Sequence, residues 1–161
     1  MESVYDHVKG VTNVVSGYAG GNQSGLTRSQ GDDPGIAEAV RITFDPTQIG
    51  YDQLLRIFFE VAHDPTQVNR QGPDIGTRYR SGIFPQNARQ KAAALQYLAT
   101  LRSSGQFIRP IATKIESGAF EAAAADQQDY VRKHPREPYV IINDVPKLED
   151  LKRRYPQLWR G

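Results

Sequence analysis

The strongest constraint on the fold is a change of hydrophobic period between two neighbouring segments. Residues 37–44 alternate apolar and polar side chains, and this period of two is typical of a half-buried strand. Asp45-Pro46 ends that strand, because proline disrupts both regular structures. Apolar side chains then recur at helical spacing through residues 51–62. A strand followed directly by an amphipathic helix predicts a domain that combines both kinds of element.

Other segments extend the same pattern along the chain. Further strands are predicted at residues 12–16, 82–84, 111–115 and 139–142. Further helices are predicted at residues 2–10, 87–103, 122–130 and 146–155. Residues 22–34 and 63–80 are rich in glycine, proline and polar side chains and indicate long loops. This order predicts an α+β fold, a two-layer sandwich with a mixed β-sheet, in one domain over residues 1–161.

Composition excludes several classes of function. The 20 Lys and Arg residues are scattered among 18 Asp and Glu, apart from Lys152-Arg153-Arg154, so we expect no nucleic-acid partner. We expect no membrane partner either, since no apolar run has the length of a spanning helix. The absence of cysteine removes disulfides, thiolate zinc sites and cysteine nucleophiles. The 3 histidines are too dispersed to predict a metal site. We expect a monomer without a bound metal.

Glu38 is the most informative single residue. It has the parity of Val40 and Ile42 on the apolar face of the predicted strand, where a carboxylate would lose hydration and favour its neutral form. A neutral carboxylic acid near pH 7 can act as a general acid. The alternative is a glutamate at the end of a strand that turns to solvent or pairs with an arginine. Parity alone favours this second interpretation.

The loop over residues 69–81 and the glycine-flanked Tyr18 offer further candidates. The loop combines hydrogen-bonding side chains with glycines, which let the backbone approach a ligand, so it could line a polar pocket. It could equally be a long loop held together by its own Asp and Arg side chains. Tyr18 could point into a cleft, or it could be a packed ring with a hydrated hydroxyl.

A series of short motifs matches one known family in order and in spacing. They are Gly10-Val11, Gly17-Tyr18-Ala19-Gly20-Gly21, Ala37-Glu38-Ala39-Val40, Phe44-Asp45-Pro46, His63-Asp64-Pro65, Arg70-Gln71-Gly72 with Asp74 and Gly76, and Tyr79-Arg80-Ser81. The run resembles the peptide methionine sulfoxide reductases of the class that acts on the S epimer. It covers roughly half of the chain, and coincidence over so many ordered motifs is improbable. The resemblance implies the ferredoxin-like methionine sulfoxide reductase A fold.

The resemblance also implies an activity and roles for individual residues. The activity is reduction of methionine-S-sulfoxide, free or in proteins, to methionine by thioredoxin or another thiol, with no bound cofactor. Glu38 is similar to the family's proton donor. Tyr18 and Tyr79 are similar to the hydroxyls that bond the sulfoxide oxygen, and Asp74 to the pocket carboxylate. The family role and the parity of Glu38 agree, which favours the general-acid interpretation.

The chain also departs from the family pattern. The family's nucleophile is a cysteine in a Gly-Cys-Phe-Trp segment that would precede Met1, so the nucleophile and the first central strand are expected to be missing. The family usually has histidine at the positions of Ile36 and Gln127, and many members carry resolving cysteines beyond Pro135. These changes could weaken the hydrogen-bond network of the site.

Two hypotheses follow from these departures. We favour an enzyme whose chain was begun at an internal methionine, because the cut removes a core strand. The alternative is a catalytically inactive family member that binds methionine sulfoxide or methionine-containing peptides without turnover, which Ile36 and Gln127 favour. By default we expect a cytoplasmic location, although a missing N-terminus could have carried an export signal.

Overall fold

The computed structural model describes residues 1–21 and 35–161, whose contacts group into two compact units. Unit 1 consists of Met1–Gly17, Val40–His63 and Ala122–Gly161, and unit 2 of Tyr18–Ala39 and Asp64–Glu121. Each unit is assembled from several stretches of chain, and the expectation of one domain over residues 1–161 stays a prediction. The predicted loop at residues 22–34 lies outside the described residues.

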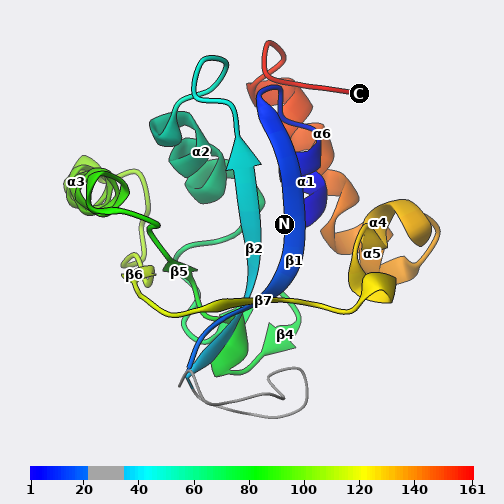
Figure 1. Cartoon of the computed structure of the whole chain (residues 1–161), viewed down its shortest axis with the longest axis horizontal. Helices are drawn as coiled ribbons and strands as arrows, with labels where there is room; N and C mark the ends of the chain where they lie inside the picture. Colours follow the sequence, from blue (N-terminus) through cyan, green and yellow to red (C-terminus); the bar gives the residue numbers. More distant parts are fainter. Residues whose placement is uncertain (22–34) are drawn as a thin grey trace. The chain divides into compact units, whose positions relative to one another are not determined.

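The longest strands form a three-stranded sheet in the order β2-β1-β7. These are β1 (Val11–Gly20), β2 (Ile36–Phe44) and β7 (Phe120–Ala122), and Figure 1 shows β1 and β2 side by side. β2 confirms the predicted strand at residues 37–44. β1 extends beyond the predicted residues 12–16, because the glycine-rich segment continues the strand instead of turning. Gly20 has φ +88°, and a β-carbon there would lie 2.6 Å from the Gly35 carbonyl oxygen.

Two pairs of short strands complete the sheets of the described residues. β3 (Arg70–Gln71) pairs antiparallel with β4 (Asp74–Ile75). β5 (Gly82–Ile83) pairs in parallel with β6 (Lys114–Ile115), which is shorter than the strand predicted at residues 111–115. Parallel and antiparallel pairing both occur, and helices and strands are present in both units, as the α+β prediction required.

Unit 1 contains the predicted helix at residues 51–62. It begins as α2 (Tyr51–Ile57) and continues as the π-helical turn η1 (Phe58–Ala62). The first helix, α1 (Glu2–Asp6), buries one face, and its Tyr5 hydroxyl donates to the Leu54 carbonyl at 3.0 Å. The buried side chains of this unit include Val4, Tyr5, Val8, Leu54, Ile57, Phe59, Val140 and Leu151. Packing of α1 against α2 and against α6 (Val145–Arg154) therefore compensates for the small number of hydrogen bonds in so short a helix.

The strand predicted at residues 139–142 is wrong, because this segment forms helix α5 (Pro138–Asn143). Proline occupies the first turn, where its missing N–H costs no hydrogen bond. The Ile141 N–H donates to the Glu137 carbonyl, as a helix requires. Val140 is fully buried while Ile142 is 69% exposed, so the apolar run does not form a continuous buried strand.

The helix predicted at residues 122–130 is also wrong. The segment contains β7, a 3-10 turn η3 (Ala125–Gln127) and only the start of α4 (Tyr130–Lys133). The Gln128 side chain accepts from the Ser16 N–H at 2.8 Å and donates to the Ser16 carbonyl at 2.8 Å. The Ala123 N–H also donates to the Ser16 carbonyl. Pairing with β1 therefore overrides the helix propensity of the alanine run.

The remaining helices agree with the sequence. In unit 2, α3 (Ala88–Ser104) begins after Asn87, whose side chain accepts from the Gln90 N–H at 2.8 Å, and ends at Gly105 with φ +70°. In unit 1, α6 (Val145–Arg154) covers most of the predicted residues 146–155, and Trp159 stacks on His7. Within residues 1–21 and 35–161, no helix combines the length and apolar character needed to cross a membrane.

Candidate functional site

The loop at residues 64–76 is held in shape by its own side chains. The Gln71 amide donates to the Asp64 carbonyl at 3.1 Å and accepts from the Asp64 N–H at 3.0 Å. Gln67 accepts from the Gly72 N–H at 2.7 Å, and the Asp64 carboxylate accepts from the Thr66 hydroxyl at 2.6 Å. These side chains therefore hold in shape the segment that leads into the β3–β4 hairpin.

Gly76 connects this hairpin to a short 3-10 turn, η2 (Thr77–Tyr79). Its φ of +142° is rarely adopted by residues with a side chain, and its N–H donates to the Asn69 carbonyl at 2.9 Å. The turn sets the positions of Arg78, Tyr79 and Arg80, which follow one another in the sequence.

Arg80 forms a clamp with Glu116 and three main-chain carbonyls. Its Nε and Nη2 donate to the two Glu116 carboxylate oxygens, each at 2.9 Å. The carbonyls, each accepting at 3.0 Å, are those of Gly35, Ile36 and Thr77. A bidentate arginine–carboxylate pair has fixed geometry, so this Arg80 clamp joins η2 to the start of β2. Ile36 and Gln127 stand where the family usually has histidine. Ile36 contributes its backbone carbonyl to the Arg80 clamp, whereas Gln127 lies in η3 of unit 1.

Arg78 is the centre of a second group, here named the Arg78 cluster, with Tyr18, Glu38, Asp74 and Tyr79. Its guanidinium carbon lies 5.7 Å from the ring centroids of Tyr18 and of Tyr79. Its Nη2 lies 3.4 Å from Glu38 Oε1. Asp74 acts electrostatically on Glu38 and Tyr79. The structure therefore brings together, within unit 2, all four site residues that the sequence predicted.

The pKa of Glu38 is shifted in the direction that a proton donor requires, although Glu38 is less buried than its parity predicted. Its side chain is 45% exposed, so one side of the carboxyl group faces solvent. Burial of the other side raises the pKa of Glu38, Arg78 opposes this shift, and Asp74 adds to it. Because the opposing ion pair with Arg78 is partly exposed to water, the direction set by burial prevails. A raised pKa favours the neutral acid that a proton donor requires.

The rings of the two tyrosines lie next to the same guanidinium group, and Tyr18 acts electrostatically on Tyr79. Burial raises the pKa of Tyr79, and the negative charges of Glu38 and Asp74 raise it further against the opposing effect of Arg78. Tyr79 therefore keeps its proton near neutral pH and can donate a hydrogen bond. Tyr18, in β1, is only 6% exposed.

Arg78 is the member of the cluster that the sequence analysis did not single out. The available signal was a cation next to the predicted Tyr79, in a loop already marked for glycines and polar side chains. Spacing along the chain cannot show that Arg78 contacts a tyrosine of β1 and a glutamate of β2, because both strands are far from it in the sequence.

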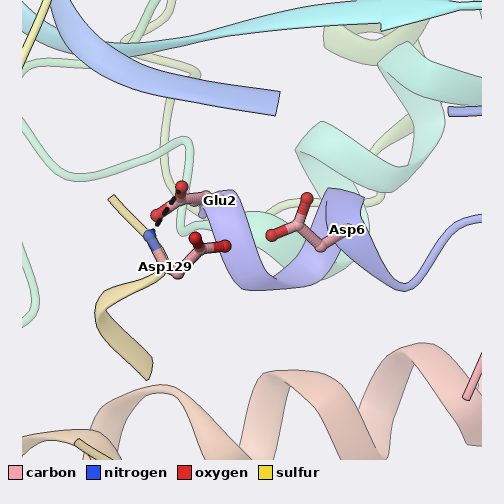
Figure 2. Close-up of side chains that lie close together, drawn as sticks. All are labelled: Glu2, Asp6 and Asp129. Carbon is pink, nitrogen blue, oxygen red and sulfur yellow. Dashed lines mark hydrogen bonds between the residues drawn. The ribbon is translucent and has the colours of Figure 1, made fainter. Parts of the chain in front are cut away.

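A separate group of acidic side chains lies in unit 1. Figure 2 shows Glu2, Asp6 and Asp129, whose carboxylate oxygens lie within 4.8 Å of one another. The Asp129 N–H donates to Glu2 at 3.0 Å, and Arg132 pairs with Asp129 at 2.8 Å. Burial raises the pKa of Asp6, and the charges of Glu2 and Asp129 raise it further. Donors of the chain itself serve Glu2 and Asp129, and the Asp129–Glu2 hydrogen bond joins α1 to the start of α4.

Comparison with known proteins assigns the chain to a family. A family model described as peptide methionine sulfoxide reductase matches residues 1–158. The chain is 44% identical to the peptide methionine sulfoxide reductase MsrA 2 of Mesorhizobium japonicum, over 99% of this chain and 83% of that protein. It is 42% identical to the protein of the same name from Synechocystis, over 96% of this chain and 74% of that protein.

Solved structures agree with this assignment. The methionine sulfoxide reductase A of Corynebacterium diphtheriae superimposes with a TM-score of 0.66 at 30% identity, covering 83% of this chain and 69% of that one. Reduced Mxr1 from Saccharomyces cerevisiae superimposes with a TM-score of 0.64 at 31% identity, covering 82% of this chain and 75% of that one. These similarities confirm the predicted α+β methionine sulfoxide reductase A fold.

Proposed function

The chain belongs to the peptide methionine sulfoxide reductase family, and from this premise we propose that the Arg78 cluster binds methionine-S-sulfoxide for reduction to methionine. One observation supports the proposal most directly. Tyr18, Glu38 and Tyr79 come from separate strands and turns, yet they lie around one guanidinium group, and Asp74 acts electrostatically on Glu38 and Tyr79. The family assignment explains why these residue types are needed together.

The reaction requires protons and electrons from different sources. Reduction converts the sulfoxide and two thiols to the sulfide, a disulfide and water. The sulfoxide oxygen leaves only after it gains protons, so a neutral Glu38 would donate the first proton while the hydroxyls of Tyr18 and Tyr79 hold the oxygen. Asp74 helps to keep Glu38 in its neutral form, since its charge raises the pKa of Glu38.

The electrons must come from thiols. The 161 residues contain no cysteine, so the group that attacks sulfur is not one of their side chains. We propose that the reductant is a thiol such as thioredoxin and that no cofactor is bound. A reducing compartment such as the cytoplasm would suit a reaction that consumes thiols. We further propose that the protein acts as a monomer on free or protein-bound methionine sulfoxide.

The proposal is tested first by binding. The purified chain is titrated with the separate S and R epimers of N-acetylmethionine sulfoxide amide, with calorimetry as the measurement. We expect the S epimer to bind at least tenfold more tightly, and we expect Glu38→Gln to weaken its binding. Glu121→Gln, an exposed carboxylate of the same unit, is the matched control and should leave both affinities unchanged. Equal affinities for the two epimers would contradict the proposal.

Turnover is then tested with a supplied nucleophile. A Gly-Cys-Phe-Trp segment is placed before Glu2, and methionine release is followed with dithiothreitol as reductant. In that protein Glu38→Gln should lower the rate by about 100-fold, the lower range for loss of a general acid. An unchanged rate in the Gln variant would remove Glu38 from the proposed mechanism.

A further inference from the structure

Arg78 has hydrogen-bonding capacity that the described part of the chain does not use. A guanidinium group carries five N–H donors and no acceptor. Within residues 1–21 and 35–161, Arg78 donates no hydrogen bond, and its one ion pair is the 3.4 Å contact with Glu38. Its Nε is buried and has no hydrogen-bond partner among these residues. A buried donor without a partner costs free energy, so the side chains around Arg78 do not satisfy this guanidinium.

The surroundings of Arg78 fix its place without using its donors. The rings of Tyr18 and Tyr79 both lie 5.7 Å from the guanidinium carbon, within the range of a cation–π interaction. That interaction depends on the positive charge and the ring face and does not require an N–H acceptor. The side chain of Arg78 is 24% exposed although its Nε is buried, so a ligand from solvent would approach the terminal Nη groups. The guanidinium is therefore held next to the two tyrosine rings, and its terminal N–H groups donate no hydrogen bond within the described residues.

The net charge of the Arg78 cluster favours a neutral ligand over an anionic one as the hydrogen-bond acceptor for Arg78. Glu38 pairs with the guanidinium of Arg78, and Asp74 acts electrostatically on Glu38, so an anionic ligand would meet a site with no excess positive charge. A neutral ligand with a strongly polar oxygen avoids this repulsion. A sulfoxide is such a ligand, because its oxygen only accepts hydrogen bonds, and arginine only donates them.

We infer that Arg78 binds the substrate by donating a hydrogen bond to the sulfoxide oxygen, and that it thereby distinguishes methionine sulfoxide from methionine. The inference rests on the proposed function, since it concerns the same site and the same substrate. Methionine lacks the oxygen, so it leaves the Arg78 donors without an acceptor. Sites with buried donors discriminate strongly against ligands that lack the matching acceptor. Arg78 would favour binding of the substrate over retention of the product.

The test compares a sulfoxide with its sulfide. Affinities of wild type, Arg78→Met and Arg78→Lys are measured by calorimetry for N-acetylmethionine-S-sulfoxide amide and for N-acetylmethionine amide, both neutral. We expect Arg78→Met to lose about tenfold in sulfoxide affinity and less than twofold in sulfide affinity. Arg109→Met is the matched control, because Arg109 is a 69% exposed arginine of the same unit, and it should change neither affinity.

Each result separates the inference from the function on which it rests. Equal losses for both ligands, or no loss for either, in Arg78→Met would overturn the role of Arg78 while wild-type binding of the S epimer still supports the function. Failure of the wild type to bind the sulfoxide would overturn both. If Arg78→Met does not fold, Arg78→Lys decides, since lysine keeps the charge but lacks the planar guanidinium with its terminal Nη donors. An unchanged ratio of sulfoxide to sulfide affinity in the lysine variant would then refute the inference.

Discussion

Arg78 and Arg80 stand two residues apart and have opposite surroundings. Arg80 makes five hydrogen bonds, two to Glu116 and three to main-chain carbonyls, and its side chain is 13% exposed. Arg78 has aromatic rings and one longer ion pair around it, and its buried Nε has no partner among the described residues. A guanidinium whose donors are satisfied holds the fold together, whereas one with unused donors is available to a ligand.

The largest effect is expected from breaking the Arg80 clamp. Arg80→Met should lower the free energy of unfolding by about 3 kcal/mol, because it leaves Glu116 and three carbonyls without their donor. For a chain of this size that corresponds to a fall in melting temperature of roughly 9 °C. Thermal and urea unfolding measure both quantities.

The exposed Arg109, which pairs with Asp64 at 3.6 Å, supplies the matched control for this comparison. Arg109→Met should change stability by less than about 0.5 kcal/mol. A melting temperature for Arg80→Met close to that of Arg109→Met would show that the clamp contributes little and that the contrast between Arg80 and Arg78 is unfounded.

A smaller loss is expected when the clamp is weakened from its other side. Glu116→Gln should destabilise the protein by about 1.5 kcal/mol, because the amide can still accept one bond from Arg80 while the charge-assisted pair is lost. In the Arg80→Met background, Glu116→Gln should lower the free energy of unfolding by much less, because the interaction between the two side chains is already lost. A double-mutant cycle from urea unfolding measures that coupling, and simple additivity of the two losses would argue against a shared interaction.

Local sequence patterns were sufficient for elements that contain their own signals. The alternating residues of β2, the helical spacing of α2 and nearly the full length of α3 were predicted. Local patterns gave the wrong element at residues 122–130, where contacts with a segment distant in the sequence determine the conformation. Gln128 and Ala123 pair with Ser16, more than 100 residues away, and no window around the alanine run contains that information.

The site divides in the same way. Glu38, Tyr18, Asp74 and Tyr79 were identified because their motifs match a family, and parity gave independent support for Glu38 alone. Parity overstated the burial of Glu38, since a residue near the start of a strand lies where the sheet is open to solvent. Arg78 has neither a period nor a spacing that marks it, and its role depends on contacts made across β1, β2 and η2.

Removing Arg78 should hardly affect stability, in contrast to Arg80. Arg78→Met loses two cation–π contacts and a partly exposed ion pair. It also removes a buried N–H group that has no hydrogen-bond partner among the described residues, which is a stabilising change. These changes oppose one another, so we expect the free energy of unfolding to change by about 0.5 kcal/mol or less. Urea unfolding tests this, and a loss comparable to that of Arg80→Met would make Arg78 a second structural clamp and not a ligand-binding residue.

The smallest effect, and the one most specific to the cluster, is the pH dependence that Glu38 gives to stability. Burial raises the pKa of Glu38 in the folded protein, so its contribution to stability is fully present below the ordinary glutamate value, about 4.3, and is lost as the pH rises through the folded pKa. Glu38→Gln should therefore match wild type at pH 4 and exceed it at pH 7 by a few tenths of a kcal/mol, a small gain because the carboxyl group is 45% exposed. Asp45 serves as a control, because its effect on the pH dependence of stability should be opposite to that of Glu38. Hydrogen bonds from Thr47 and Gln48 lower the pKa of Asp45, so Asp45→Asn should be less stable than wild type at pH 7, and the difference should shrink as the pH falls. A Glu38→Gln variant that is less stable than wild type at pH 7 would mean that the ion pair with Arg78 outweighs burial, and that Arg78 is already satisfied by Glu38 before any ligand binds.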